Sequence, residues 1–195
     1  RAPSLIRASY DFLQHHQTVA DPRKFAQQTE AEPLRCDAAL MWTNAFCFET
    51  KRATLVPAEL AYFPFFPHDY QTPCLYPCST NGLASGASYL EAVIHGFYEV
   101  IERHYCYLFE AGAVEVEAIY EQEVSSAAVQ RAMRNLHGDF ELQLYAMRVP
   151  TVRRNLPFIM CLLVGDDAIH SGYGCSGNVE MSIERAVSEA FQSRA

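Results

Sequence analysis

Two glutamates three residues apart, Glu99 and Glu102, lie in a segment with helical spacing. Side chains at positions i and i+3 are neighbours on a helix, so two ionised carboxylates there repel each other. Mg²⁺ could offset the repulsion, because it accepts carboxylate oxygens and shares its remaining positions with phosphate and water. The same pattern also occurs on ordinary solvated helix faces, and that interpretation stays open at this point.

The helix that carries this pair is expected from about Tyr89 to Tyr107. Advancing each residue by ~100° divides it into two faces. The face predicted to pack on the core holds Leu90, Val93, Ile94, Phe97, Val100 and Ile101. The opposite face holds Glu91, His95, Glu99 and Glu102, with Arg103 adjoining. A polar, glycine-containing turn at residues 79–86 precedes the helix, and a helix N-terminus of this kind suits an anion.

A second helix, expected from about Val179 to the end of the chain, has a similar layout. Its apolar side holds Ile183, Ala186, Val187, Ala190 and Phe191, and its polar side holds Arg185, Ser188, Glu189 and Gln192. Arg194 projects toward the apolar side, so Arg185 is the better candidate for a phosphate contact. Residues 82–102 align weakly with residues 172–192 at a constant offset of 90 (189 − 99). Each copy is predicted to be a glycine-rich turn followed by a helix.

The remaining segments predict a mixed α/β (α+β) domain. Further helices are expected over residues 3–17 and 125–136, and strands over 39–48, 52–63, 140–146 and 157–164. Residues 64–77 should form an irregular, proline-rich loop, and residues 171–177 a glycine-rich loop.

Other polar residues are weaker candidates for a site. His15 and His16 are expected at an exposed helix end, and loop hydrogen bonding is favoured over a functional pair for His68 and Asp69. His170 precedes the second glycine-rich loop and could lie near a site. Trp42 is expected in the core. The chain has no Gly-x-Ser-x-Gly elbow, Walker loop or dinucleotide fingerprint.

Composition narrows the class of protein. The chain has 195 residues, half of them hydrophobic, and a net charge of −8. An acidic chain is a poor candidate for bulk nucleic-acid binding, whereas a carboxylate-held metal can still carry a nucleotide. The seven cysteines form no dense framework, and Cys74 and Cys78 have no second pair at zinc spacing. We therefore expect reduced thiols, a cytoplasmic location and no membrane span.

Together these motifs resemble the YcaO family. The run from Ser79 to Gly86, followed by Glu91-Ala92 and by residues 95–103, is similar to the family's second ATP-site segment. The run from Ser182 to Arg194 is similar to its later Ala-x-x-Glu-x-x-Gln segment, and residues 55–58 to its Val-Pro-Ala element. The resemblance extends over most of the chain from about residue 39 onward.

The resemblance implies a YcaO-like fold and an enzyme that uses ATP and Mg²⁺ to phosphorylate a peptide backbone amide. An azoline ring, a thioamide or an amidine follows, as in thiazole and oxazole formation in ribosomally made peptides. By analogy Glu99 and Glu102 hold Mg²⁺, whereas Glu91, Arg103, Arg185, Glu189 and Gln192 contact the nucleotide or complete the site. No residue is assigned a catalytic role. A homodimer, a peptide substrate and a partner that binds a leader peptide are also expected.

Three departures from the family pattern limit the analogy. Ala87 replaces the usual asparagine after Gly86, His104 replaces the aspartate of azoline-forming members, and the family's first Ser-x-Gly-Lys-Gly segment has no counterpart. We therefore expect one YcaO-like domain over residues 1–195, lacking that segment and the C-terminal part. Two alternatives remain: a non-catalytic peptide-binding or scaffold module, and, more remotely, a Cys/His hydrolase.

Overall fold

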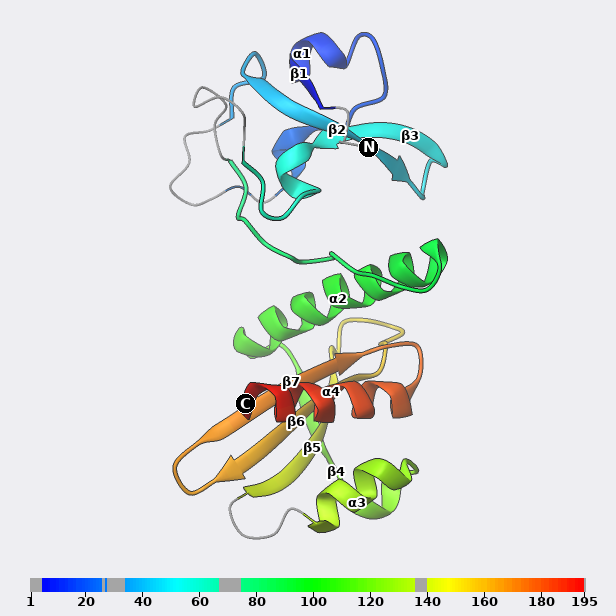
Figure 1. The fold of residues 1–195 in the computed structure, drawn as a ribbon, viewed down its shortest axis with the longest axis vertical. Coiled ribbons are helices and arrows are strands. Elements are labelled where there is room, and N and C mark those ends of the chain that lie inside the picture. Colours follow the sequence, from blue (N-terminus) through cyan, green and yellow to red (C-terminus); the bar gives the residue numbers. More distant parts are fainter. Residues whose placement is uncertain (1–4, 26, 28–33, 67–74, 136–139, 195) are drawn as a thin grey trace. The chain divides into compact units, whose positions relative to one another are not determined.

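The computed structural model describes residues 5–25, 27, 34–66, 75–135 and 140–194. The chain divides into two compact units, Arg1–Leu83 and Ala84–Ala195. Figure 1 traces both units. No helix in the described ranges is long and apolar enough to cross a membrane. His68, Asp69 and Cys74 lie outside the described residues.

The first unit is built on a three-stranded antiparallel sheet of order β1-β2-β3. Its elements are β1 (Ile6–Ser9), α1 (Tyr10–Leu13), η1 (Pro22–Lys24), β2 (Ala39–Cys47), β3 (Arg52–Pro57) and η2 (Ala58–Leu60). The strands expected over 39–48 and 52–63 are confirmed, the second ending at Pro57. Trp42 is fully buried, as predicted, and its Nε1–H donates to the Ala8 carbonyl at 2.9 Å.

The helix expected over residues 3–17 is largely wrong. Residues 6–9 instead form β1, with Ile6 opposite Trp42 of β2, and only α1 is helical. Pairing with β2 satisfies the backbone of β1 and brings Ile6 and Ala8 against the core around Trp42. These tertiary contacts override the weak local preference for helix.

The second unit is a four-stranded antiparallel sheet of order β4-β5-β6-β7 with helices on both faces. Its elements are α2 (Tyr89–Glu110), β4 (Glu115–Ile119), η3 (Glu121–Glu123), α3 (Ala127–Asn135), β5 (Phe140–Arg148), β6 (Phe158–Gly165), β7 (Ile169–Cys175) and α4 (Val179–Arg194). The expected helices and the strands over 140–146 and 157–164 are confirmed. With the first unit's sheet, the structure is the mixed α/β class that the sequence predicts.

Alternation along β6 divides the core of this unit into two layers. Phe158 and Met160 pack with Tyr105 of α2 on one face of the sheet. Ile159 and Cys161 pack on the other face with Ile183 and the other apolar residues of α4, together with α3. Because both faces are covered, β6 is buried along most of its length, and its sequence is a continuous apolar run.

The predicted glycine-rich loop at residues 171–177 is wrong over most of its length, because residues 169–175 form strand β7. The glycines serve close packing. A Cβ on Gly172 would lie 2.2 Å from the Ala186 carbonyl oxygen and the Ala190 nitrogen, and one on Gly174 would lie 2.0 Å from the Ser182 carbonyl oxygen. Their absence of side chains lets α4 lie directly on β7. The two copies of the weak repeat therefore share only their helices, which begin at Tyr89 and Val179.

The prediction of which face of α2 packs on the core is also largely wrong. Leu90 is 64 % exposed, Ile94 42 %, Phe97 60 % and Val100 46 %. The buried residues of α2 are instead Gly96, Glu102 and Tyr105. Glu102 therefore faces β7 and Glu99 is half-buried, whereas Ile101 of the predicted face does pack on the core.

Candidate functional site

The outer edge of β7 is bonded along its length by side chains from two helices. The Cys175 N–H donates to Glu102 Oε2 of α2 at 3.0 Å, and the Tyr173 N–H donates to Glu189 Oε2 of α4 at 2.8 Å. The Ser171 carbonyl accepts from Ser193 Oγ at 3.1 Å. Alternate residues of an edge strand direct their backbone groups outward, so two carboxylates from opposite faces of the sheet meet at this edge.

The electrostatics of Glu102 reflect this position. Burial, as the largest cause, and the negative charge of Glu189 both raise the pKa of the Glu102 carboxyl above its ordinary value. The charges of Arg185 and Arg103 and the hydrogen bond from the Cys175 N–H act in the opposite direction. Glu102 is 8 % exposed as a residue. A divalent cation beside the pair would relieve both the burial cost and the mutual repulsion.

The donor atoms fit Mg²⁺ together with a phosphate-bearing ligand. Each carboxylate uses Oε2 on β7, while Oε1 of Glu102 and Oε1 of Glu189 make no hydrogen bond to described residues. Every fully buried polar side-chain atom in the described part has a partner, so these two oxygens remain in contact with solvent. No three acidic, histidine or cysteine side chains there form a ready metal cage. Mg²⁺ characteristically uses one or two carboxylates and takes its other ligands from water and phosphates.

The start of α2 is shaped by its own polar residues. Ser88 Oγ accepts from the Glu91 N–H at 3.2 Å, and Glu91 Oε2 accepts from the Ala87 N–H at 2.8 Å. His95 Nδ1 lies 3.2 Å from the Ser85 carbonyl. A Cβ on Gly86 would lie 2.6 Å from the Ala92 nitrogen, so the incoming chain lies close against the helix. Glu91, predicted to contact the nucleotide, thus has a capping role here.

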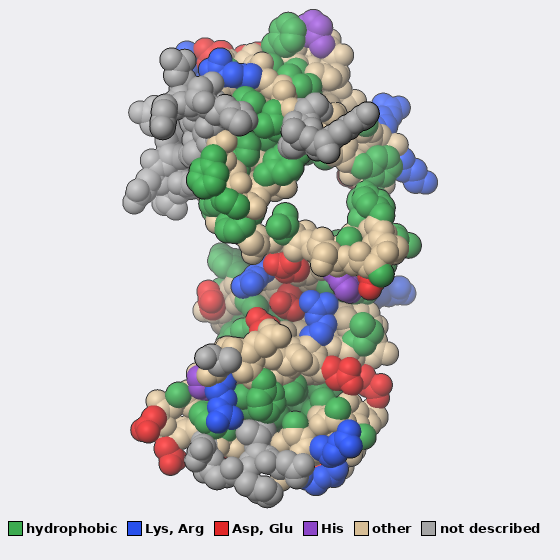
Figure 2. Space-filling model, viewed as in Figure 1, with side chains coloured by type: hydrophobic (Ala, Val, Ile, Leu, Met, Phe, Trp, Pro, Cys, Tyr) green, Lys and Arg blue, Asp and Glu red, His purple; other side chains and the backbone are tan. Residues whose placement is uncertain are grey.

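The other residues predicted for the site are distributed along the same two helices. Glu99 lies one turn before Glu102 and is half-buried, and Arg103 is exposed beside Glu102. Arg185 lies one turn before Glu189 and is half-buried, whereas Gln192 is exposed near the end of α4. Figure 2 shows acidic and basic side chains next to one another on the visible face of the second unit. The charges of Glu189, Arg185 and Arg103 all act on the Glu102 carboxyl, so the structure brings together Glu102, Glu189 and Arg185, with Arg103 at the margin.

Two weaker candidates have structural explanations. His170 Nδ1 lies 3.2 Å from the Ser193 carbonyl, at the end of α4 away from Glu102. The Arg194 guanidinium lies 4.5 Å from the centre of the Phe140 ring. Arg194 therefore faces the apolar side of α4, as its position in the sequence predicts.

The cysteines do not form a reactive centre in the described part. Burial raises the pKa of Cys161 and Cys175 to about 12, and that of Cys106 to about 11. Hydrogen bonding from Thr50 lowers the pKa of Cys47, and no histidine is bonded to that thiol among the described residues. These thiols are free, as expected, and they give no support to a Cys/His hydrolase.

Sequence reasoning missed the backbone component of the site. The N–H groups of Tyr173 and Cys175 orient the two carboxylates, yet residues 171–177 were interpreted as a loop. Tyr98 was also missed. A Cβ on Gly177 would lie 2.7 Å from the Tyr98 hydroxyl, so this ring contacts the turn that leads into α4. A small residue at each of positions 172, 174 and 177 was the available signal for close packing.

Comparison with known proteins identifies the family to which this chain belongs. The model for the YcaO family, described as ATP- and Mg²⁺-binding cyclodehydratases, matches residues 1–195. The chain belongs to the YcaO family, whose cofactors are ATP and Mg²⁺. An uncharacterized protein of Mycobacterium tuberculosis is 30 % identical over 162 residues, which is 80 % of this chain and 35 % of that protein. One of Methanothermobacter thermautotrophicus is 31 % identical over 169 residues, covering 80 % and 41 %.

Solved structures share the fold. The heterocyclase TruD superposes with a TM-score of 0.76 at 18 % identity, over 96 % of this chain and 30 % of TruD. YcaO from Methanopyrus kandleri, bound with AMPPCP and Mg²⁺, has a TM-score of 0.70 at 19 % identity, over 97 % and 45 %. A heterocyclase in complex with substrate and cofactor has a TM-score of 0.74 at 19 % identity, over 95 % and 27 %. The chain thus spans less than half the length of these proteins.

Proposed function

We propose that this chain contributes the Glu102–Glu189 part of a magnesium–nucleotide site in an ATP-dependent cyclodehydratase that acts on a peptide. The observation that carries the proposal is the convergence of two carboxylates on the outer edge of β7, with Arg185 nearby. Membership of the YcaO family supports the nucleotide and the metal. A related fold with substrate and cofactor bound supports the peptide-modifying role.

In this proposal the charged residues would bind the metal and the phosphates, and the other polar residues would position them. Glu102 and Glu189 would hold Mg²⁺ through their solvent-facing Oε1 atoms, with Glu99 one turn away as a further carboxylate. Arg185 and Arg103 would contact phosphate oxygens, Gln192 would complete the polar end of α4, and Glu91 would fix the start of α2 near the nucleotide. Bound Mg²⁺ and ATP supply charge neutralisation and the phosphoryl group.

The proposed reaction converts a poor leaving group into a good one. The γ-phosphoryl group passes to the oxygen of a backbone amide, leaving ADP. A side-chain hydroxyl or thiol, or an external sulfide, then attacks the carbon, and the oxygen departs within inorganic phosphate. With a side-chain nucleophile the product is an azoline and the net loss is one water. With sulfide the product is a thioamide.

The test is calorimetric titration of the intact protein with AMPPCP in the presence and absence of Mg²⁺. Binding should require Mg²⁺ and should weaken by about tenfold or more in the Glu102→Gln and Glu189→Gln variants, because each loses one charged ligand. Glu141→Gln on the exposed side of β5 is the matched control and should bind normally. Binding that was absent, or unchanged in both variants, would overturn the proposal and favour a scaffold module.

A further inference from the structure

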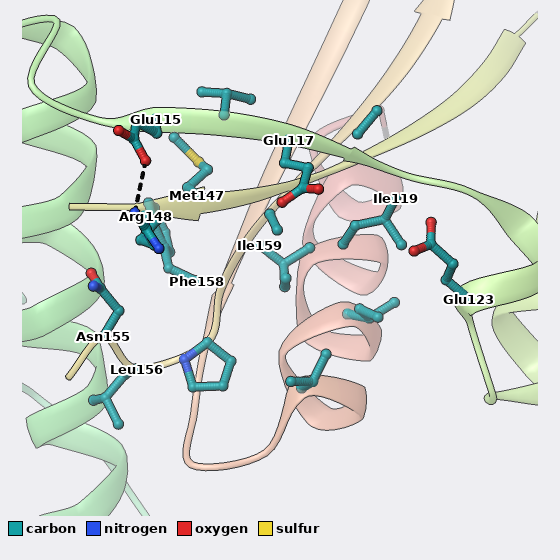
Figure 3. Close-up of a pocket in the computed structure, with 16 residues that line it drawn as sticks. Glu115, Glu117, Ile119, Glu123, Met147, Arg148, Asn155, Leu156, Phe158 and Ile159 are labelled. Carbon is teal, nitrogen blue, oxygen red and sulfur yellow. Dashed lines mark ion pairs between the residues drawn. The ribbon is translucent and has the colours of Figure 1, made fainter. Parts of the chain in front are cut away.

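A hollow lies beside β4, at the other edge of the same sheet (Figure 3). Its volume is about 940 Å³, within the range of ligand pockets. Apolar side chains line it, among them Ile119, Ala146, Ile159 and Ile183. Glu115, Glu117, Glu123 and Arg148 also line it. The hollow is thus apolar inside and charged at its margin.

The backbone of β4 is available for pairing on its outer side. β4 is the terminal strand of the sheet and pairs only with β5 among the described residues. No other hydrogen bond in the described part involves the backbone of residues 115–119. β7, the opposite edge, differs because Glu102, Glu189 and Ser193 bond its outward groups. The open edge is therefore the one that borders the hollow.

The charge at the margin is negative after internal pairing. Arg148 lies 3.2 Å from Glu115, so this cation is already partnered. Glu123 accepts from the Tyr120 N–H. Glu117 makes no hydrogen bond or ion pair with described residues, and in Figure 3 its carboxylate points from β4 toward Ile159. A ligand that meets this margin would be complementary if it carried positive charge beside apolar side chains.

We propose that β4 and the adjoining hollow bind an extended peptide segment whose side chains on the side of the hollow, at every second position, are apolar or basic. The segment adds a strand to the outer edge of β4, and its backbone satisfies the free N–H and C=O groups there. Apolar side chains enter the hollow, and a lysine or arginine pairs with Glu117. The inference rests on the proposed function, since it assigns a binding surface for the peptide of a peptide-modifying enzyme.

A second copy of this chain fits the edge less well than a basic peptide. Antiparallel pairing of β4 with β4 would bring the carboxylates of Glu115 and Glu117 close to those of the other copy. Like charges opposite each other in a sheet are destabilising. The acidic margin therefore selects against self-association and for a cationic partner.

The experiment measures fluorescence anisotropy of a labelled pentapeptide, acetyl-Lys-Ser-Val-Ser-Lys, with the intact protein in the absence of nucleotide. In an extended strand its two lysines and its valine lie on the same face. The matched peptide acetyl-Glu-Ser-Val-Ser-Glu should bind at least about fivefold more weakly. Glu117→Arg should weaken binding of the basic peptide by about fivefold or more, while Glu141→Arg on β5 should not. Hydrogen exchange should slow at residues 115–119 and stay unchanged at residues 169–175 on addition of the basic peptide.

Three results would overturn the inference: equal affinity for the two peptides, equal loss in the two variants, or slowed exchange away from β4. A doubling of the sedimentation mass that Glu117→Arg abolishes would also overturn it, in favour of a second copy. A different result tests the proposed function. Glu117→Arg should leave Mg²⁺-dependent AMPPCP binding unchanged, and loss of nucleotide binding with retained peptide binding would contradict only the magnesium–nucleotide site.

Discussion

Glu102 and Glu189, on helices that cover opposite faces of one sheet, accept hydrogen bonds from N–H groups two residues apart on β7. The strand therefore sets the separation of the two carboxylates. Because the donors are backbone groups in a paired strand, their positions are fixed by the sheet. The two carboxylates are thus positioned without a ligand, which would reduce the ordering cost if the pair bound one.

Stability should depend on pH through Glu102. A raised pKa in the folded protein means that the folded state binds the proton more tightly than the unfolded state. The free energy of unfolding should therefore fall as the pH rises from the ordinary value of 4.5 through the raised pKa. Glu102→Gln keeps an acceptor for the Cys175 N–H and should flatten this slope. Urea unfolding at a series of pH values measures it, and an unchanged slope would contradict the assignment.

Glu189 should contribute to the stability of the fold through its hydrogen bond to the Tyr173 N–H as much as through its charge. Glu189→Ala leaves the Tyr173 N–H without its acceptor and should destabilise the protein by about 1–3 kcal/mol. Glu189→Gln retains an acceptor and should cost much less. It should also lower the pKa of Glu102, because one of the causes that raise it is removed. Thermal unfolding and NMR titration of the Glu102 carboxyl test these expectations, and equal destabilisation by both variants would refute the hydrogen-bond role.

Gly174→Ala should be strongly destabilising. The added Cβ would lie 2.0 Å from the Ser182 carbonyl oxygen, so α4 would have to move away from β7 at a cost of about 3 kcal/mol. Gly112→Ala is the comparison. It has a φ of +70° and open space around its Cβ, so only backbone strain of about 1–2 kcal/mol applies. If Gly174→Ala proved the milder change in denaturant unfolding, close packing of α4 on β7 would be wrong.

The exposed apolar face of α2 should contribute little to stability. Phe97→Ser should change the free energy of unfolding by less than about 0.5 kcal/mol, because the ring is 60 % exposed. Tyr105→Ser on the buried face should cost about 3–5 kcal/mol. Chemical denaturation of the two variants provides the measurement. A loss for Phe97→Ser comparable to that for Tyr105→Ser would mean that Phe97 lies in a packed interface.

The sequence predicted most elements of the second unit, because their apolar periods agree with the contacts they make. It placed the candidate site residues on two helices, now α2 and α4, but did not predict which of them lie together. Projection placed Glu102 on a polar face and assumed that the apolar face was inside. In the structure Glu102 is buried and most of the apolar face is exposed, because hydrogen bonding to β7 makes a buried carboxylate tolerable. Helical periodicity distinguishes a polar face from an apolar one. It cannot show which face will be buried, because that depends on the hydrogen-bond partners that a neighbouring strand edge offers.

β7 was mispredicted for a related reason. Glycines at positions 172 and 174 are typical of loops, and nothing local marks them as contacts for a helix that comes later in the chain. The same applies to β1, whose pairing with β2 depends on residues thirty or more positions away, as in the Ile6–Trp42 pair. β4 was not predicted at all. Its Glu115-Val116-Glu117 alternation is short, and most of the strand is exposed.

The unequal edges of the second unit's sheet also bear on its solubility. A filament that grows by strand addition needs two open edges on every subunit, one for each neighbour. Here the helix side chains along β7 leave that edge unable to accept a strand. Any association through this sheet would stop once a single β4 edge had been occupied, so the sheet cannot propagate into a fibre.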